Sequence, residues 1–232
     1  PEPREWILGA LYLPVFLFFL NFAILTYFPA LGFPLTEPRN YFFANLLYMT
    51  VNFAVMLLIF RRTLWQSLRE FEGKMLLSVL IGFGMCYGAN LVLTTAYTVL
   101  DIMPENYNQE AVNSLLGGYP LAMTLCTVVL APLAEECLFR GVLFAPLARK
   151  CLPAAYALSM FLFAGMHVFQ FLGSMTAANT ILCLSLYLPA SFSLCWVYQK
   201  TGNIWACIFL HMFINFQSVL ASLLRSLMQA FL

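Results

Sequence analysis

The chain alternates between long apolar runs and short polar connections. Seven apolar runs are long enough to cross a bilayer, because about 20 mostly apolar residues span a hydrocarbon core of about 30 Å. They lie near residues 6–28, 41–60, 75–100, 115–148, 152–171, 177–198 and 203–230. The pattern therefore predicts an all-α, polytopic transmembrane helix bundle of about seven spans, with little chain left outside the bilayer.

The fourth run, 115–148, is too long for a single crossing. It contains Pro120, Pro132 and Pro146, and each proline removes a backbone donor and favours a kink or a break. We predict one crossing that ends in a bent or interfacial helix around Pro146.

Composition agrees with a lipid-covered protein. Hydrophobic residues make up 62% of the chain and charged residues 9%, whereas soluble domains carry about a quarter charged residues. The formal net charge of +1 and the lack of a basic arm give no indication of nucleic-acid binding. Membrane lipids are thus the expected general partners, and no oligomeric state follows from the sequence.

The distribution of charge predicts an orientation, because basic loops stay in the cytoplasm. The connection between the second and third runs carries Arg61, Arg62, Arg69 and Lys74. Alternation places the connection at 149–150 on the same side. The acidic stretch 101–110 falls on the opposite side. We therefore predict a cytoplasmic N-terminus and an extracytoplasmic C-terminus, in a bacterial plasma membrane.

The fourth run contains charged residues that are costly within lipid. Glu135, Glu136 and Arg140 are flanked by apolar residues on both sides, and such groups are functional candidates by default. Glu136 and Arg140 are four residues apart and can pair along one helix. Glu135 is offset from Glu136 by about 100° and is free to point elsewhere. We interpret Arg140 as structural rather than catalytic.

Two later runs contribute the histidines, His167 and His211, and Asn215 shares a helical face with His211. Glu135, His167 and Asn215 each lie 14 to 17 residues from the basic residues at the predicted cytoplasmic ends of their spans. At 1.5 Å per residue these offsets are similar depths of roughly 20–25 Å. Each residue alone could be a helix-packing contact, but their common depth favours one shared buried site, which we expect to open to the cytoplasm.

These residues form three motifs in order, EExxxR, FxxxH and HxxxN. They read Glu135-Glu136-x-x-x-Arg140, Phe163-x-x-x-His167 and His211-x-x-x-Asn215. In this the chain resembles the CPBP family of CAAX-protease and bacteriocin-processing intramembrane proteases, also called the type II CAAX prenyl endopeptidase or abortive-infection family. The resemblance covers about residues 118–220. It suggests N-terminal transmembrane helices at 1–114 and a catalytic core of four motif-carrying helices at 115–232, within one membrane unit.

The resemblance implies an endopeptidase that hydrolyses a peptide bond of a membrane-associated peptide or protein. Glu135 with His167 resembles the pair that holds and deprotonates water. His211 and Asn215 resemble the pair that stabilises the oxyanion. Glu136, Arg140 and Phe163 would support the site.

A metal site is the open alternative for the mechanism. Glu135, His167 and His211 could also form a zinc set with an open position for water. We favour the form without a metal, and expect no cofactor, because Asn is a poor zinc ligand and no HExxH motif occurs.

Two further functions compete with proteolysis. One is a catalytically inactive, protease-like scaffold that regulates membrane partners. The other is a small proton-coupled transporter, since buried Glu, His and Arg can form a proton relay. The intact motifs disfavour the scaffold, and the lack of visible repeats disfavours the transporter.

Overall fold

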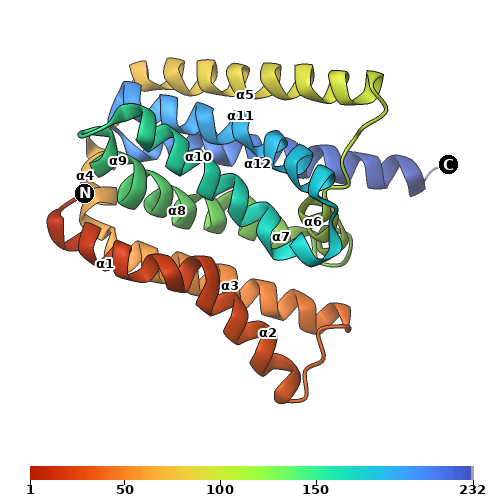
Figure 1. Cartoon of the computed structure of the whole chain (residues 1–232). Coiled ribbons are helices and arrows are strands. Elements are labelled where there is room, and N and C mark those ends of the chain that lie inside the picture. The colour runs from red at the N-terminus through yellow and green to blue at the C-terminus, as the bar shows by residue number, and fades with distance from the viewer. Residues whose placement is uncertain (231–232) are drawn as a thin grey trace.

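A computed structural model describes residues 1–230, and helices are the regular secondary structure in this range (Figure 1). Seven helical stretches are long and apolar enough to cross a membrane. They are Pro3–Ala30, Pro38–Ile59, Gly73–Val99, Pro120–Ala148, Leu152–Ser174, Ala177–Thr201 and Ile204–Gln229. The prediction of a seven-span helical bundle is confirmed, and the chain is an integral membrane protein.

The motif-carrying helices lie between two sets of N-terminal helices. The bundle centre holds α8 (Ala131–Glu136), α10 (Leu152–Val168), α11 (Ala177–Thr201) and α12 (Ile204–Ala230). On one side α5 (Gly73–Val99) packs on α11 and α12, and on the other α1 (Pro3–Pro14) and α3 (Pro38–Ile59) pack on the fourth span (Figure 1). The remaining part of the first span is a π-helical segment, Val15–Phe19, and α2 (Leu20–Ala30).

The fourth span is continuous from α7 (Pro120–Leu125) to α9 (Ala145–Ala148). Two π-helical segments interrupt its α-helical ladder, η2 (Cys126–Leu130) and η3 (Cys137–Phe144). The helix thus runs past Pro146 to Ala148 without a break, and the predicted bend around Pro146 stays a prediction.

Contacts made by α1 explain how the helix tolerates Pro146. This residue has no N–H to donate to the carbonyl of Val142, four residues earlier. The indole Nε1 of Trp6 donates to that carbonyl instead, at 2.9 Å. Gly9 permits the close approach, since a Cβ there would lie 2.5 Å from Cγ2 of Val142.

The long fourth run is instead divided at its other end. There α6 (Tyr107–Gly118) is a separate helix, and the backbone of Tyr119 is not helical. The predicted boundary between residues 114 and 115 falls inside α6. The division into 1–114 and 115–232 remains a prediction.

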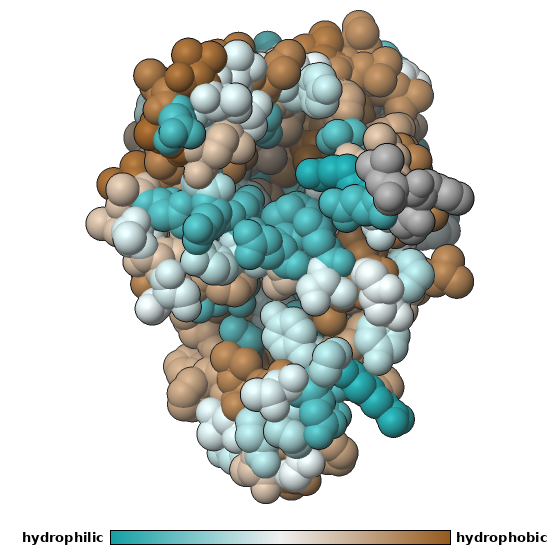
Figure 2. All heavy atoms as spheres, turned by 90° about the vertical axis from the view of Figure 1, so that its right-hand side faces the viewer, coloured by the Kyte–Doolittle hydropathy of each residue, from teal (hydrophilic) through white to brown (hydrophobic). Residues whose placement is uncertain are grey.

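The two ends of the bundle differ in charge. The N-terminus, α4 (Arg61–Arg69) and α9 lie at one end, and α6 lies at the other (Figure 1). The first end carries the basic connections and the second the acidic stretch 101–110. Figure 2 shows the second end, where hydrophilic side chains gather in the middle of the face among hydrophobic ones. This separation fits the predicted orientation, which itself remains a prediction.

Candidate active site

A buried ion pair joins Glu136 to Arg140. The distance from Arg140 Nε to Glu136 Oε2 is 3.1 Å, and both side chains are fully buried. Arg140 also donates through Nη2 to the carbonyl and hydroxyl oxygens of Ser191 on α11, at 3.1 and 3.3 Å. A buried charge is stable only when it is paired and hydrogen-bonded, so Glu136, Arg140 and Ser191 join two helices of the core. The pairing predicted from the four-residue spacing is confirmed.

His211 lies between the two glutamates. Its Nδ1 is 2.8 Å from Glu136 Oε1, and its Nε2 is 3.9 Å from Glu135 Oε2. Glu136 therefore binds Arg140 and His211 at once, a contact that the sequence did not reveal. Its side chain has no exposed surface, whereas that of Glu135 is 13% exposed.

Glu135 has an unused hydrogen-bonding atom. Its Oε2 is buried and accepts no hydrogen bond from the part of the protein that the structure describes. Buried polar atoms normally have partners. Because this atom lies 3.9 Å from His211 Nε2, one water at about 2.8 Å from each could contact both. The arrangement can hold a water against a carboxylate base.

His167 enters from α10, with its ring near that of Phe163. Its Nδ1 lies 2.8 Å from the carbonyl oxygen of Phe163. A carbonyl can only accept, so Nδ1 carries the proton and, in the neutral ring, Nε2 is left as an acceptor. The Phe163 ring centroid is 4.9 Å from that of His167 and 5.6 Å from that of His211. Among the ion pairs of residues 1–230, the histidine within 4.0 Å of Glu135 is His211.

Asn215, on α12, donates a hydrogen bond to a backbone carbonyl that the π-helical segment of the fourth span leaves free. The N–H of Ala131 donates to the carbonyl of Cys126, and Pro132 has no N–H. The carbonyl of Thr127 is therefore left without its usual donors in the helix. The side-chain Nδ2 of Asn215 donates to it at 2.8 Å. An amide nitrogen carries two hydrogens, so one donor of Asn215 is used in packing and one remains.

A polar stripe continues along α12 beyond the third motif. Ser218 donates to Gln109 at 3.2 Å and Ser222 donates to Asn113 at 2.8 Å, both on α6. With His211 and Asn215 they follow the three- and four-residue spacing of one helical face. That spacing was the sequence signal that could have extended the predicted site toward α6.

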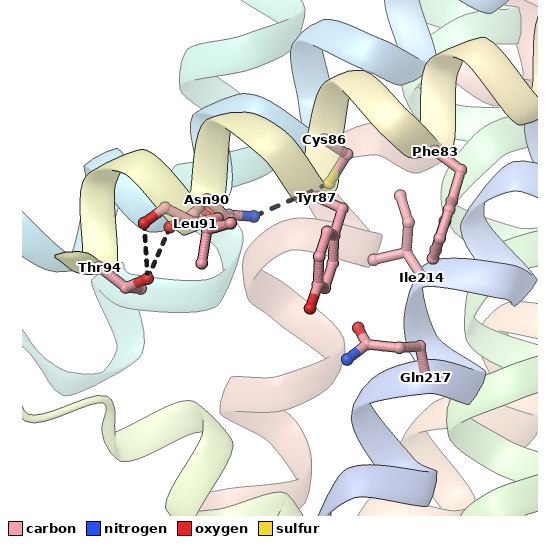
Figure 3. A pocket seen from close by; sticks show the side chains of 8 residues that line it. All are labelled: Phe83, Cys86, Tyr87, Asn90, Leu91, Thr94, Ile214 and Gln217. Atoms are coloured by element: carbon pink, nitrogen blue, oxygen red, sulfur yellow. Dashed lines mark hydrogen bonds between the residues drawn. The ribbon is translucent and has the colours of Figure 1, made fainter.

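A separate cavity of about 260 Å³ lies between α5 and α12. Tyr87 and Asn90 of α5 line it together with Ile214 and Gln217 of α12, and Figure 3 shows Tyr87 and Gln217 approaching each other across it. His211 and Asn215 instead contact the fourth span. The cavity is therefore distinct from the cluster around Glu135.

The zinc alternative requires Glu135, His167 and His211 to close around one ion. Among residues 1–230, no three His, Cys, Asp or Glu side chains are grouped so that they could hold a metal ion. The Nδ1 atoms of both histidines are bound, that of His211 to Glu136 and that of His167 to a carbonyl, so both Nε2 atoms are available. Histidines that bind zinc commonly have this second bond, so the zinc alternative stays open, and the roles below use these side chains without a metal.

A comparison with known protein families matches the part of the chain that carries these residues. Residues 117–217 match the family described as type II CAAX prenyl endopeptidase Rce1-like. This part of the chain is therefore similar to that family. The Rce1-like match contains all three motifs, and therefore every residue of the predicted site.

A bacterial protein is also similar to this chain in sequence. The chain is 28% identical over 166 residues to the Bacillus subtilis (strain 168) protein named "Putative membrane peptidase YdiL". The aligned region covers 69% of this chain and 64% of that protein, so the chain spans less than two thirds of the length of this relative. No solved structure matches the chain significantly. Both the description of the family and the name of this relative are those of peptidases.

Proposed function

We propose that the chain is a membrane-embedded endopeptidase that hydrolyses a peptide bond of a membrane-associated peptide or protein with water activated by Glu135. The supporting observation is the contrast between the adjacent glutamates. Glu136 Oε1 binds both Arg140 and His211, and its Oε2 lies 3.1 Å from Arg140 Nε in an ion pair. Glu135 Oε2 is buried without a hydrogen bond in the described structure, and its ion-pairing neighbour there, His211 Nε2, is 3.9 Å away. A free carboxylate at this place suits a general base.

The reaction then follows from the available donors and acceptors. Glu135 takes one proton from the water, and Nε2 of His167 accepts a hydrogen bond from the other. The hydroxide attacks the scissile carbonyl carbon, and Glu135 passes its proton to the leaving amine nitrogen. The oxyanion receives hydrogen bonds from Nε2 of His211 and from the second hydrogen of Asn215. This role requires His211 to carry a proton on Nε2 as well as the one shared with Glu136.

Asn215→Ala is expected to lower kcat by roughly 10²–10³-fold with little change in KM, the usual effect of losing one oxyanion donor. The variant also loses the bond to Thr127, so the melting temperature must be measured alongside the kinetics. Asn45→Ala is the matched control, because Asn45 also donates through Nδ2 to a carbonyl, that of Tyr41 at 2.9 Å. A lowered melting temperature with unchanged kcat would make Asn215 a packing residue and remove it from the oxyanion site.

Activity is expected to persist after treatment with a strong chelator, and purified active protein should contain zinc well below one ion per chain. The measurement is metal content by mass spectrometry beside the rate of peptide cleavage. A zinc enzyme would lose metal on His167→Ala or His211→Ala and regain activity only with added zinc. That result would turn Glu135, His167 and His211 into metal ligands and refute the proposed roles.

A further inference from the structure

His167 is in contact with an aromatic residue outside the three motifs. The ring of Tyr187, on α11, is stacked on its imidazole, with centroids 4.6 Å apart and planes inclined by 24°. The bond from His167 Nδ1 to the Phe163 carbonyl holds one edge of the ring. A single bond to one ring atom still permits the imidazole to swing, and a parallel aromatic ring at this distance restricts that swing.

The hydroxyl of Tyr187 is held from both sides by the start of α6. It donates to Oδ1 of Asn106 at 3.0 Å and accepts from Nδ2 of Asn108 at 3.2 Å. A tyrosine whose ring stacks and whose hydroxyl has two partners has little freedom to rotate.

The backbone around these asparagines is fixed to the same helix. Asn179, Cys183 and Tyr187 lie four residues apart on one face of α11. Asn179 exchanges hydrogen bonds of 2.9 and 3.0 Å with the backbone of Glu105, and Cys183 donates to the Glu105 carbonyl. The Glu105–Asn108 segment therefore lies along the α11 face that supports Tyr187.

The segment also reaches the end of the span that carries His167. Tyr107 stacks on Phe171, with ring centroids 6.1 Å apart, in the 3-10 helix η4 (Phe169–Ser174) directly after α10. The helix that carries His167, α10, and the helix that carries Tyr187, α11, are thus joined through the Glu105–Asn108 segment at the end of the bundle where α6 lies (Figure 1).

We propose that Tyr187 is a positioning residue, which Asn106 and Asn108 hold against His167 so that Nε2 points toward the water on Glu135. This inference rests on the proposed function for its kinetic consequence. It also gives the Glu105–Asn108 segment, which lies outside the family match at 117–217, a part in setting the geometry of the site.

Three variants separate the contribution of the Tyr187 ring from that of its hydroxyl group. Tyr187→Leu removes the ring, and Tyr187→Phe keeps the ring but loses both hydroxyl contacts. Tyr97→Phe is the matched control. The Tyr97 hydroxyl is hydrogen-bonded at 2.6 Å to Ser185, which lies on α11 like Tyr187, and the Tyr97 ring contacts neither histidine ring in the described structure. Tyr187→Leu is expected to lower kcat by roughly 10- to 100-fold, the range that misplacement of a catalytic group can produce. KM should change little, Tyr187→Phe should lie between Tyr187→Leu and wild type, and Tyr97→Phe should behave as wild type.

A second readout does not depend on activity. The chain contains two histidines, so protein labelled with ¹⁵N-histidine reports each imidazole separately. Wild type should show His167 as a single Nδ1–H tautomer, and Tyr187→Leu should show it exchanging between tautomers while His211 is unchanged. An unchanged His167 spectrum in Tyr187→Leu, or equal changes at both histidines, would overturn the inference. If the proposed function is wrong, wild type will show no cleavage that depends on Glu135. The ¹⁵N spectrum of His167 would still decide whether Tyr187 positions this ring.

Discussion

Glu135→Gln is expected to lower kcat by roughly 10²–10⁴-fold, the usual contribution of a general base. The amide has the same shape but cannot take a proton from water. Because Glu135 Oε2 has no partner in the described structure, the change breaks no internal hydrogen bond at that atom, and the yield and melting temperature should stay near those of wild type. Cleavage of a membrane peptide by purified protein measures kcat, and thermal unfolding in detergent measures the melting temperature.

Two further glutamate substitutions show whether the loss of kcat is specific to Glu135. Glu110→Gln, on the exposed surface of α6, is the matched control and should leave kcat unchanged. Glu136→Gln should reduce both kcat and stability, because it weakens the bonds to Arg140 and His211 together. Near-normal turnover in Glu135→Gln would show that another group activates the water.

Arg140→Ala is expected to lower the free energy of unfolding by about 3–5 kcal/mol, because it leaves the carboxylate of Glu136 buried without its charged partner. It also removes the two bonds to Ser191. The measurement is the melting temperature together with the fraction of protein that elutes as a folded species in size-exclusion chromatography.

Arg225→Ala provides the comparison for this loss. Arg225 is exposed on α12, and its Nε donates to the Ala221 carbonyl one turn earlier. Its replacement should change stability by less than about 0.5 kcal/mol, as for most surface substitutions. If Arg140→Ala were as stable as Arg225→Ala, the buried ion pair could not be what holds Glu136 in place.

The sequence predicted the features that depend on local pattern. Hydropathy located all seven spans, because the length of an apolar run has to match the thickness of the membrane. The four-residue spacing located the ion pair of Glu136 with Arg140, since residues so spaced are neighbours on any α-helix. The common depth of Glu135, His167 and Asn215 predicted one shared site, and in the structure Glu135 Oε2 lies 3.9 Å from Nε2 of His211, one turn before Asn215.

Contacts that depend on tertiary packing could not be read from the sequence. Whether Glu136 or Glu135 binds His211 is decided by how α8 and α12 are rotated against each other. Asn215 bonds to Thr127 because a π-helical segment and Pro132 together leave a carbonyl free, and hydropathy gives no sign of a π-helical segment. Likewise, Pro146 does not end its helix because Trp6, far away in sequence, supplies the missing donor.

The most direct test of peptide-bond hydrolysis by Glu135-activated water is the appearance of new peptide termini. Purified wild type and Glu135→Gln, each reconstituted in liposomes, would be incubated with a set of single-span membrane peptides and prenylated CAAX peptides, and the products identified by mass spectrometry. We expect new termini with wild type alone, in fragment pairs whose summed mass equals that of the substrate plus one water. New termini in equal amounts with both proteins, or none with either, would contradict a peptidase that uses Glu135 to activate water.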